Sequence, residues 1–338
     1  MDRLETLSIV VPCYNEEAMV VELVEHLDMV LSKLTGEGLV GEDSHIVLVD
    51  DGSTDQTWPL ICSSCETYKR VNGVKLSGNV GHQNALMAGL TVAKDTSDLI
   101  VSLDADLQDD TSVISEMIKL SRQGNDVVYG VRKDRTSDSL AKRETAQIFY
   151  KTMKVLGVRT VYNHADYRLM TKKAVEYLSE FNERNLYLRG LVPLLGCKSA
   201  TVEYKREERR EGKSKYSIRK MLHLAMDGIT SFTDVPVHIV LWLGVAFLAV
   251  SFGILVYVMV SYFIHSVVPG WSSLMLSIWF CSGCVLTSLG VIGEYIGKIY
   301  VEVKGRPRYR IEKKSGEKVC NIPPTIQKAQ RGEDDGEV

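Results

Sequence analysis

Acidic and basic residues are absent from one long part of this sequence: residues 235–293 contain no Asp, Glu, Lys or Arg. A membrane-spanning helix needs about 20 apolar residues, so this stretch has room for two. Pro269 and Gly270 interrupt it and predict a turn. We therefore expect a hairpin of two transmembrane helices, at 237–264 and 273–299. A buried helical hairpin in a soluble protein is disfavoured, because charge-free helices of this length are rare there.

Basic residues flank the apolar stretch on both sides. Segment 205–220 carries eight Lys or Arg against three Glu, and segment 294–314 carries seven against three. The turn between the predicted helices carries none. The positive-inside rule therefore places both flanks in the cytosol and the turn outside. We expect a multi-pass protein of the cytoplasmic (inner) membrane whose two termini and N-terminal part are cytosolic.

Two further features argue against other classes of function. The formal net charge is only −3, which indicates no nucleic-acid partner. The seven cysteines are odd in number, and neither C-x-x-C pair, at 62–65 or 281–284, has a second pair of ligands nearby. Reduced thiols are therefore expected rather than a metal centre. The first residues are expected to begin a buried strand rather than a secretory leader.

Short apolar runs alternate with helical patterns through the first 200 residues or so. This alternation is typical of an α/β domain with a mostly parallel sheet. Ligands of such sheets bind outside the carboxyl ends of the strands. The predicted strands begin near Leu7, His45, Asn72, Asp98 and Asp126, and the predicted helices cover residues 16–34, 53–68, 82–93 and 111–124.

Acidic residues gather directly after these predicted strands. Asp104 and Asp106 follow an apolar run, and alternate residues of an extended segment face the same side. Two carboxylates, with Gln108 as a third oxygen ligand, are typical of Mg²⁺ or Mn²⁺ that is also bound by substrate phosphates. Asp-x-Asp also occurs in surface turns, so the motif alone does not predict a metal site. The prediction rests on the position of Asp104 and Asp106 directly after a predicted strand. Asp109 and Asp110 are instead expected to favour the dipole of the next helix.

The segment 49–55, VDDGSTD, allows two interpretations. It can be a turn with a helix cap, which is the role expected for Asp55. It can also bind a nucleotide, with Asp51 accepting a hydrogen bond from a nucleobase N–H and Gly52 allowing close approach. Glycines at 78 and 81 precede a predicted helix whose N-terminus could hold phosphate, although two glycines alone are a weak signal.

These motifs together resemble glycosyltransferase family 2. The resemblance covers about residues 7–310 and includes the polyprenyl-phosphate glycosyltransferases, the group of the bactoprenol glucosyltransferases and dolichyl-phosphate mannose synthase. It implies a GT-A fold, which is a Rossmann-like α/β catalytic domain, followed here by the two-helix transmembrane hairpin. It is carried by VVPCYNEE, LVDDGSTD, GHQNALMAG, SLDADLQDD, HADYRLM, FNERNLYLRGL, EGKSKYSIRKMLHLAMDGITSFT and GEYIGKIYVEVKGRPRY.

The resemblance also implies roles for individual residues. The residues implied to bind the nucleotide sugar are Pro12, Tyr14, Asn15, Glu16, Asp51, Gly81, His82 and Asp104, with Asp51 at the uracil. The implied metal ligands are Asp104, Asp106 and Gln108, and the implied catalytic residues are Asp166 and Asp106. The residues implied to hold the acceptor phosphate are Arg132, Arg143, Arg206, Arg209 and Lys215. The sequence departs from the family pattern at Asn84 and at Tyr167, where Phe is usual.

The implied reaction moves a hexose from a UDP-sugar to undecaprenyl or another polyprenyl phosphate, with inversion and with Mg²⁺ or Mn²⁺. A phosphate monoester has a second pKa of about 6, so the acceptor needs little deprotonation. Asp166 is therefore expected to orient a substrate rather than act as a base. The product would serve cell-envelope glycan modification, and relatives suggest a homotetramer. The sugar stays open, and GDP is not excluded as the carrier.

The sequence disfavours two other functions. A processive polysaccharide synthase would carry a Gln-x-x-Arg-Trp segment, and the sequence contains no Arg-Trp pair. A membrane protein that binds sugar nucleotides without turnover is disfavoured by the intact acidic motif. The expected organisation is a GT-A domain (1–210), a juxtamembrane amphipathic helix (211–234), two transmembrane helices (235–300) and a cytosolic tail with a disordered end (301–338).

Overall fold

The computed structural model describes residues 3–133, residues 164–204 except 182 and 185, scattered positions between 237 and 260, and residues 270–316. These residues belong to two compact units. The first unit contains the described residues up to 204 together with residues 305–316. The second contains the described positions between 237 and 260 and helix α10 (Trp271–Val303).

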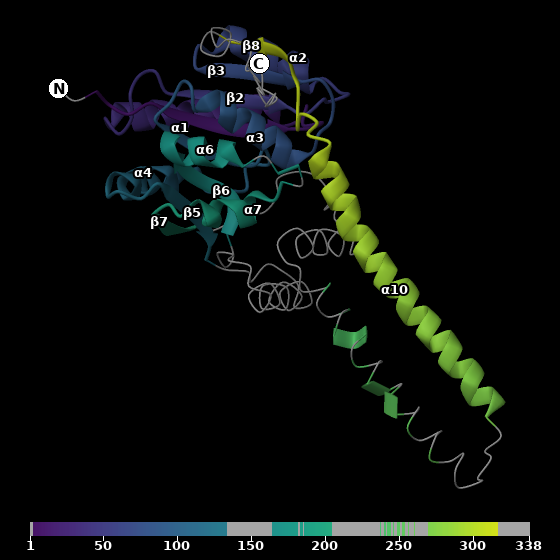
Figure 1. The fold of residues 1–338 in the computed structure, drawn as a ribbon. Coiled ribbons are helices and arrows are strands. Elements are labelled where there is room, and N and C mark those ends of the chain that lie inside the picture. Colours follow the sequence, from purple (N-terminus) through teal and green to yellow (C-terminus); the bar gives the residue numbers. More distant parts are fainter. Residues whose placement is uncertain are drawn as a thin grey trace, which may run out of the picture. The chain divides into compact units, whose positions relative to one another are not determined.

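The first unit is built on one eight-stranded sheet with the order β7-β5-β6-β4-β1-β2-β3-β8 (Figure 1). Its centre is parallel, because every strand there is followed by a helix that returns the chain to the same edge. The central parallel strands are β1 (Leu7–Cys13), β2 (His45–Asp50), β3 (Val71–Leu76) and β4 (Leu99–Ser102).

Antiparallel strands extend this parallel centre on both sides. On one side β6 (His164–Thr171) lies antiparallel between β4 and β5 (Val127–Arg132), and β7 (Ser199–Tyr204) pairs with β5 in parallel. On the other side β8 (Ile311–Ser315) pairs antiparallel with β3. The sheet therefore includes a strand that follows the apolar helix in the sequence.

Helices pack on both faces of the sheet because the residues of β1 are apolar on both sides. Ile9 and Val11 belong to the core cluster that contains Leu23 and Leu27 of α1. The neighbouring Val10 faces α3, where a Cβ added to Gly89 would lie 2.4 Å from its Cγ1. The helices are α1 (Val20–Gly36), α2 (Thr57–Thr67), α3 (His82–Ala93), η1 (Thr111–Val113), α4 (Ile114–Arg122), α6 (Lys172–Glu180), α7 (Leu188–Leu191) and η2 (Val192–Leu195).

The alternating pattern read from the first 133 residues is confirmed, since β1 to β5 and α1 to α4 lie where it placed them. The sequence did not indicate the eighth strand. Within the segment 301–338, which is expected to be cytosolic, Ile311–Ser315 form an edge strand of the sheet. Its sequence, IEKKS, is mostly polar because an edge strand is only partly covered, so it lacked the apolar run that marked the central strands.

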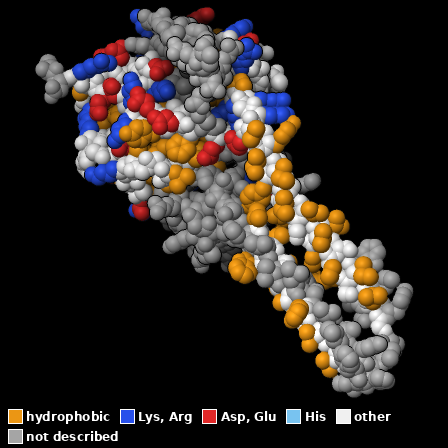
Figure 2. Space-filling view, viewed as in Figure 1, with side chains coloured by type: hydrophobic (Ala, Val, Ile, Leu, Met, Phe, Trp, Pro, Cys, Tyr) orange, Lys and Arg blue, Asp and Glu red, His pale blue; other side chains and the backbone are white. Residues whose placement is uncertain are grey.

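Helix α10 corresponds to the second predicted transmembrane helix. Its portion Phe280–Val303 is long and apolar enough to cross a membrane, with a mean hydropathy of 1.3. Figure 2 shows hydrophobic side chains along much of this helix. The described positions between 237 and 260 are helical, but most of the first predicted span and all of 211–234 lie outside the described residues. Within the described part of the chain α10 is the one candidate span, so a two-helix hairpin is not confirmed.

Candidate active site

The loop after β1 and the loop after β2 are tied together by Asn15. The backbone N–H of Asn15 donates to Ser53 Oγ at 3.0 Å, and its side-chain oxygen accepts from the backbone N–H of Thr54 at 2.9 Å. Asn15 has a left-handed backbone with a φ of 52°, which asparagine tolerates better than most residues. Tyr14 beside it is 44% exposed, while Pro12 lies buried within β1. The two loops therefore form one wall at the carboxyl edge of the sheet.

Asp51 anchors the loop that leads into α3. Its carboxylate is 2% exposed and accepts from the backbone N–H groups of Val80, at 2.8 Å, and Gly81, at 3.0 Å. Burial raises the pKa of Asp51, and the two N–H groups act against this by stabilising the ionised form. Asp51 thus shapes the loop at residues 78–81, and its contact with a nucleobase stays a prediction.

Gly52 permits the close approach of this loop. It has a φ of 68°, and a Cβ at this position would lie 2.5 Å from the carbonyl carbon of Gly78. We expect Gly52→Ala to destabilise the protein by about 2–4 kcal/mol, because it strains the turn and pushes the loop away. Thermal unfolding measures this effect. Gly78→Ala is the matched control, since its Cβ would meet nothing within 4 Å, and an equal loss there would contradict this explanation.

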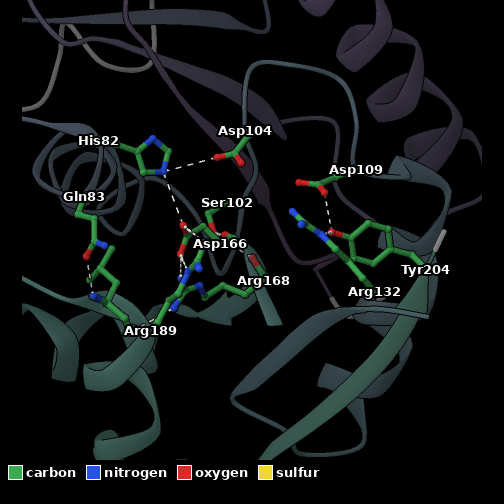
Figure 3. A network of polar contacts seen from close by, with 11 residues as sticks. His82, Gln83, Ser102, Asp104, Asp109, Arg132, Asp166, Arg168, Arg189 and Tyr204 are labelled. Carbon is green, nitrogen blue, oxygen red and sulfur yellow. Dashed lines mark hydrogen bonds and ion pairs between the residues drawn. The ribbon is translucent and has the colours of Figure 1, made fainter. Parts of the chain in front are cut away.

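Two carboxylates face one histidine at the centre of the site (Figure 3). Nε2 of His82, the first residue of α3, lies 3.5 Å from Oδ1 of Asp104 and 3.9 Å from Oδ2 of Asp166. The pKa of Asp104 is raised to about 6, first by burial and then by the charges of Asp166, Asp109 and Asp106, while His82 lowers it. Crowded negative charge is therefore a property of this site.

Asp166 is held by two arginines. It lies on β6, and its Oδ1 is 2.7 Å from Nη2 of Arg168 on the same strand, while its Oδ2 is 3.0 Å from Nη2 of Arg189 on α7. Nε of Arg189 also donates to Oδ1 at 3.2 Å. Burial opposes ionisation of Asp166, but Arg189 and Arg168 outweigh it and hold its pKa well below the usual range. Asp166 therefore remains a carboxylate at every physiological pH.

The backbone around this ion cluster is fixed by two further hydrogen bonds. Ser102, the last residue of β4, donates from its hydroxyl to the Asp166 carbonyl at 2.7 Å. Gln83 accepts from the backbone N–H of Leu188 at 2.8 Å, which joins the start of α3 to the start of α7. The segment that carries Arg189 is thus tied to the segment that carries His82.

A second polar cluster lies beside the first (Figure 3). Asp109 accepts from the hydroxyl of Tyr204 at 2.5 Å, and Nε of Arg132 lies 3.4 Å from the same hydroxyl. The sequence did not indicate this contact of the buried Asp109 with Tyr204 on β7, and the role of Asp109 at the next helix stays a prediction. Asp110 behaves as predicted, because it caps η1 by accepting from the N–H of Ser112 at 2.9 Å. Arg132 is brought near the acidic loop.

The acidic loop itself is a turn. β4 ends at Ser102, Leu107 has a φ of 50°, and the backbone N–H of Gln108 donates to Asp106 Oδ1 at 3.2 Å. The prediction of an extended segment at residues 104–108 is therefore wrong. The side chain of Gln108 is buried, with 7% of the residue exposed. The described residues contain no group of three or more His, Cys, Asp or Glu placed to hold a metal. The donor set fits an ion held by one or two carboxylates and completed by substrate oxygens, as Mg²⁺ commonly is.

The structure brings together Asp104, His82 and Asp166, and it places the loops of Asn15 and Asp51 at the same edge. Four residues assigned to the acceptor phosphate lie outside the described residues: Arg143, Arg206, Arg209 and Lys215. Sequence reasoning missed Arg168, Arg189 and Tyr204, which contact the carboxylates. It also missed Gln83 and Ser102, which bind the neighbouring backbone. A signal existed for one of them, since Arg168 alternates with Asp166 in the sequence of β6, so that both side chains are expected on the same side of the strand.

Comparison with known proteins agrees with this geometry. Residues 8–178 match the family described as Glycosyl transferase family 2. The chain is 48% identical over 306 residues to the uncharacterized glycosyltransferase YkoT of Bacillus subtilis, covering 90% of this chain and 91% of that protein. It is 36% identical over 311 residues to the SfII prophage-derived bactoprenol glucosyl transferase of Shigella flexneri, covering 91% and 97%.

Among solved structures, glucosyl-3-phosphoglycerate synthase of Mycobacterium tuberculosis, in complex with Mn²⁺, uridine diphosphate and phosphoglyceric acid, is 17% identical with a TM-score of 0.44, covering 67% of this chain and 76% of that one. The strand order and the family match together describe a GT-A-like α/β fold with a mostly parallel sheet. This chain belongs to glycosyltransferase family 2.

Proposed function

We propose that this glycosyltransferase moves a sugar from a UDP-sugar to a polyprenyl phosphate such as undecaprenyl phosphate, at the cytosolic face of a membrane. The observation that carries the proposal is the similarity to a protein named bactoprenol glucosyl transferase, which spans 91% of this chain. The match covers nearly the whole of this protein. This protein also has an exposed apolar helix, α10. A lipid acceptor stays in the bilayer, so an enzyme that uses it gains from an anchor in the same membrane.

The donor is proposed to lie between the loop at residues 78–81 and the acidic turn. The N-terminus of α3, with His82 half-exposed, favours an anionic diphosphate through its unpaired backbone N–H groups. A divalent metal held by Asp104 and Asp106, with Gln108 nearby, would neutralise charge on the departing diphosphate. Asn15, Glu16 and Asp51 are proposed to line the nucleotide side.

The acceptor phosphate is proposed to approach beside Asp166. Its oxygen forms a bond to the anomeric carbon while the bond from that carbon to the diphosphate breaks, which inverts the centre. Asp166 is a poor base here because Arg168 and Arg189 depress its pKa, and the acceptor is already ionised. Asp166 therefore orients the sugar, and the two arginines offset its charge so that an anionic acceptor can enter. Arg132 adds positive charge on the neighbouring strand β5.

Radiolabel transfer tests this proposal directly. Full-length protein in detergent is incubated with undecaprenyl phosphate and a panel of UDP- and GDP-sugars, with and without EDTA. We expect one or a few UDP-sugars to give a lipid-extractable product that depends on added Mg²⁺ or Mn²⁺. The absence of lipid-linked product from every donor would reject the proposed reaction. A GDP-sugar as the only working donor would correct the nucleotide, and transfer that survives both EDTA and Asp106→Ala unchanged would reject the metal.

A further inference from the structure

Three consecutive residues that follow α10 in the sequence contact three separate segments of the first unit. The guanidinium of Arg308 donates to the carbonyl of Phe181. The hydroxyl of Tyr309 donates to Thr91 Oγ1 at 3.1 Å. The carbonyl of Arg310 accepts from the backbone N–H of Ser77 at 2.9 Å. Strand β8 then begins at Ile311, which is paired with Leu76.

Each contacted segment carries part of the site. Phe181 ends α6 and begins the connection to α7, where Arg189 binds Asp166. Thr91 belongs to α3, whose first residue is His82. The segment at residues 308–310 therefore contacts the helix that begins at His82 and the residue that follows α6, on the chain that leads to Arg189 in α7.

The third contact concerns the loop that Asp51 holds from its other end. Ser77 is the residue between β3 and the loop at 78–81, and its N–H is satisfied by Arg310. The backbone of Val80 and Gly81 is satisfied by Asp51. The loop is thus secured at its start by the segment after α10 and at its end by the loop after β2.

We propose that Arg308 and Tyr309, with the backbone of Arg310, are positioning residues that hold the loop at 78–81, α3 and α7 in the arrangement that binds the sugar nucleotide. The chain beyond the apolar helix is then a working part of the donor site. This inference rests on the proposed function for what the site binds. It differs from a general stabilising role because the contacts fall on α3, which begins at His82, on the residue that leads from α6 toward α7, and on the residue that begins the loop at 78–81.

The test uses the full-length chain with Tyr309→Phe, Arg308→Ala and Arg308→Lys. A misplaced site can lose up to about a hundredfold in rate, so we expect Tyr309→Phe and Arg308→Ala to lower kcat/KM for the donor by roughly 10- to 100-fold. Arg308→Lys keeps a donor and is expected to restore part of the loss. Glu312→Gln is the matched control on β8, because it removes only an exposed pair with Lys75 at 3.9 Å and is expected to change kcat/KM less than about twofold.

Hydrogen exchange supplies a readout that needs no turnover. Backbone amides of residues 77–83 and 187–191 are expected to exchange faster in Tyr309→Phe and Arg308→Ala than in the wild type, while amides of β1 are unchanged. Unaltered exchange in these segments together with wild-type donor kinetics would overturn the inference. If the wild type transfers no sugar but the exchange changes as expected, the proposed function fails and the positioning role stands. Equal losses in Glu312→Gln would also overturn it.

Discussion

Asp166→Asn is expected to lower kcat by roughly a hundred- to a thousandfold and also to destabilise the fold. The loss of rate follows from the place of Asp166 between His82 and two arginines, where its charge is fixed on both oxygens. An asparagine keeps the size of the side chain but has one oxygen instead of two acceptors. Sugar transfer to undecaprenyl phosphate measures the rate, and thermal unfolding in the same detergent measures the stability.

The expected loss of stability comes from what remains after the substitution. Arg168 is 1% exposed, so its charge would stay buried with a weaker partner. Removing one member of a buried ion pair costs about 3–5 kcal/mol, and the partial exposure of Arg189 puts the expected loss at the low end. Asp126→Asn is the control, because Asp126 pairs with the more exposed Lys173 at 3.3 Å and such pairs contribute about 0–1 kcal/mol. Equal unfolding temperatures for the two variants would contradict the buried-pair explanation.

The pH dependence expected for Asp166→Asn follows from the direction in which the pKa of Asp166 is shifted. A carboxylate whose folded pKa lies below its unfolded value adds stability above the unfolded pKa and loses it only as the pH falls through the folded value. The pKa of Asp166 lies well below the usual range, so its contribution is constant from about pH 5 upward. Asp166 stays ionised across this range, so Asp166→Asn should lower the rate at every pH. The acidic limb should move only slightly to lower pH, because the charge of Asp166 contributes to the raised pKa of Asp104. Loss of the acidic limb would instead indicate that Asp166 acts as a base.

The parts that could be predicted from sequence are those whose signal is local. Strands β1, β2 and β4 are buried on both faces, so they are apolar runs, and the polar residues at their ends mark the edge where ligands bind. Asp104 could be found in this way without any knowledge of the fold. Asp110 could be assigned because a helix cap depends only on its neighbours in the chain.

The parts that could not be predicted depend on contacts between distant segments. Arg189 reaches Asp166 only because α7 packs beside β6, and Tyr204 reaches Asp109 only because β7 joins the sheet next to β5. The edge strand β8 could not be predicted for the same reason, since its partner β3 lies far away in the sequence. Spacing rules also failed within residues 104–108, because a left-handed residue, Leu107, turns the chain where alternation had been assumed.

Asp104→Asn is expected to abolish metal-dependent transfer while leaving the unfolding temperature unchanged or slightly higher. The loss of activity follows from removal of the proposed metal ligand, a change worth several kcal/mol in charge stabilisation. The opposite effect on stability follows from the raised pKa of Asp104, because an ionised carboxylate among Asp106, Asp109 and Asp166 destabilises the metal-free fold at neutral pH. A large drop in unfolding temperature would show that Asp104 has a structural role instead.

Competition between protons and metal gives the same carboxylate a distinct pH signature. Without metal the pKa of Asp104 is about 6, so below that pH the site is mostly protonated and a cation must displace the proton. The apparent affinity for Mn²⁺ should therefore fall by up to about tenfold for each pH unit below 6. Raising the Mn²⁺ concentration should move the acidic limb of the rate profile to lower pH.

Asp166→Asn should retain this movement, because the proton that competes with the metal is bound by Asp104. An acidic limb that does not respond to Mn²⁺ would show that the titrating group does not bind the metal. The acidic limb would then be assigned to the acceptor phosphate, whose own pKa is about 6.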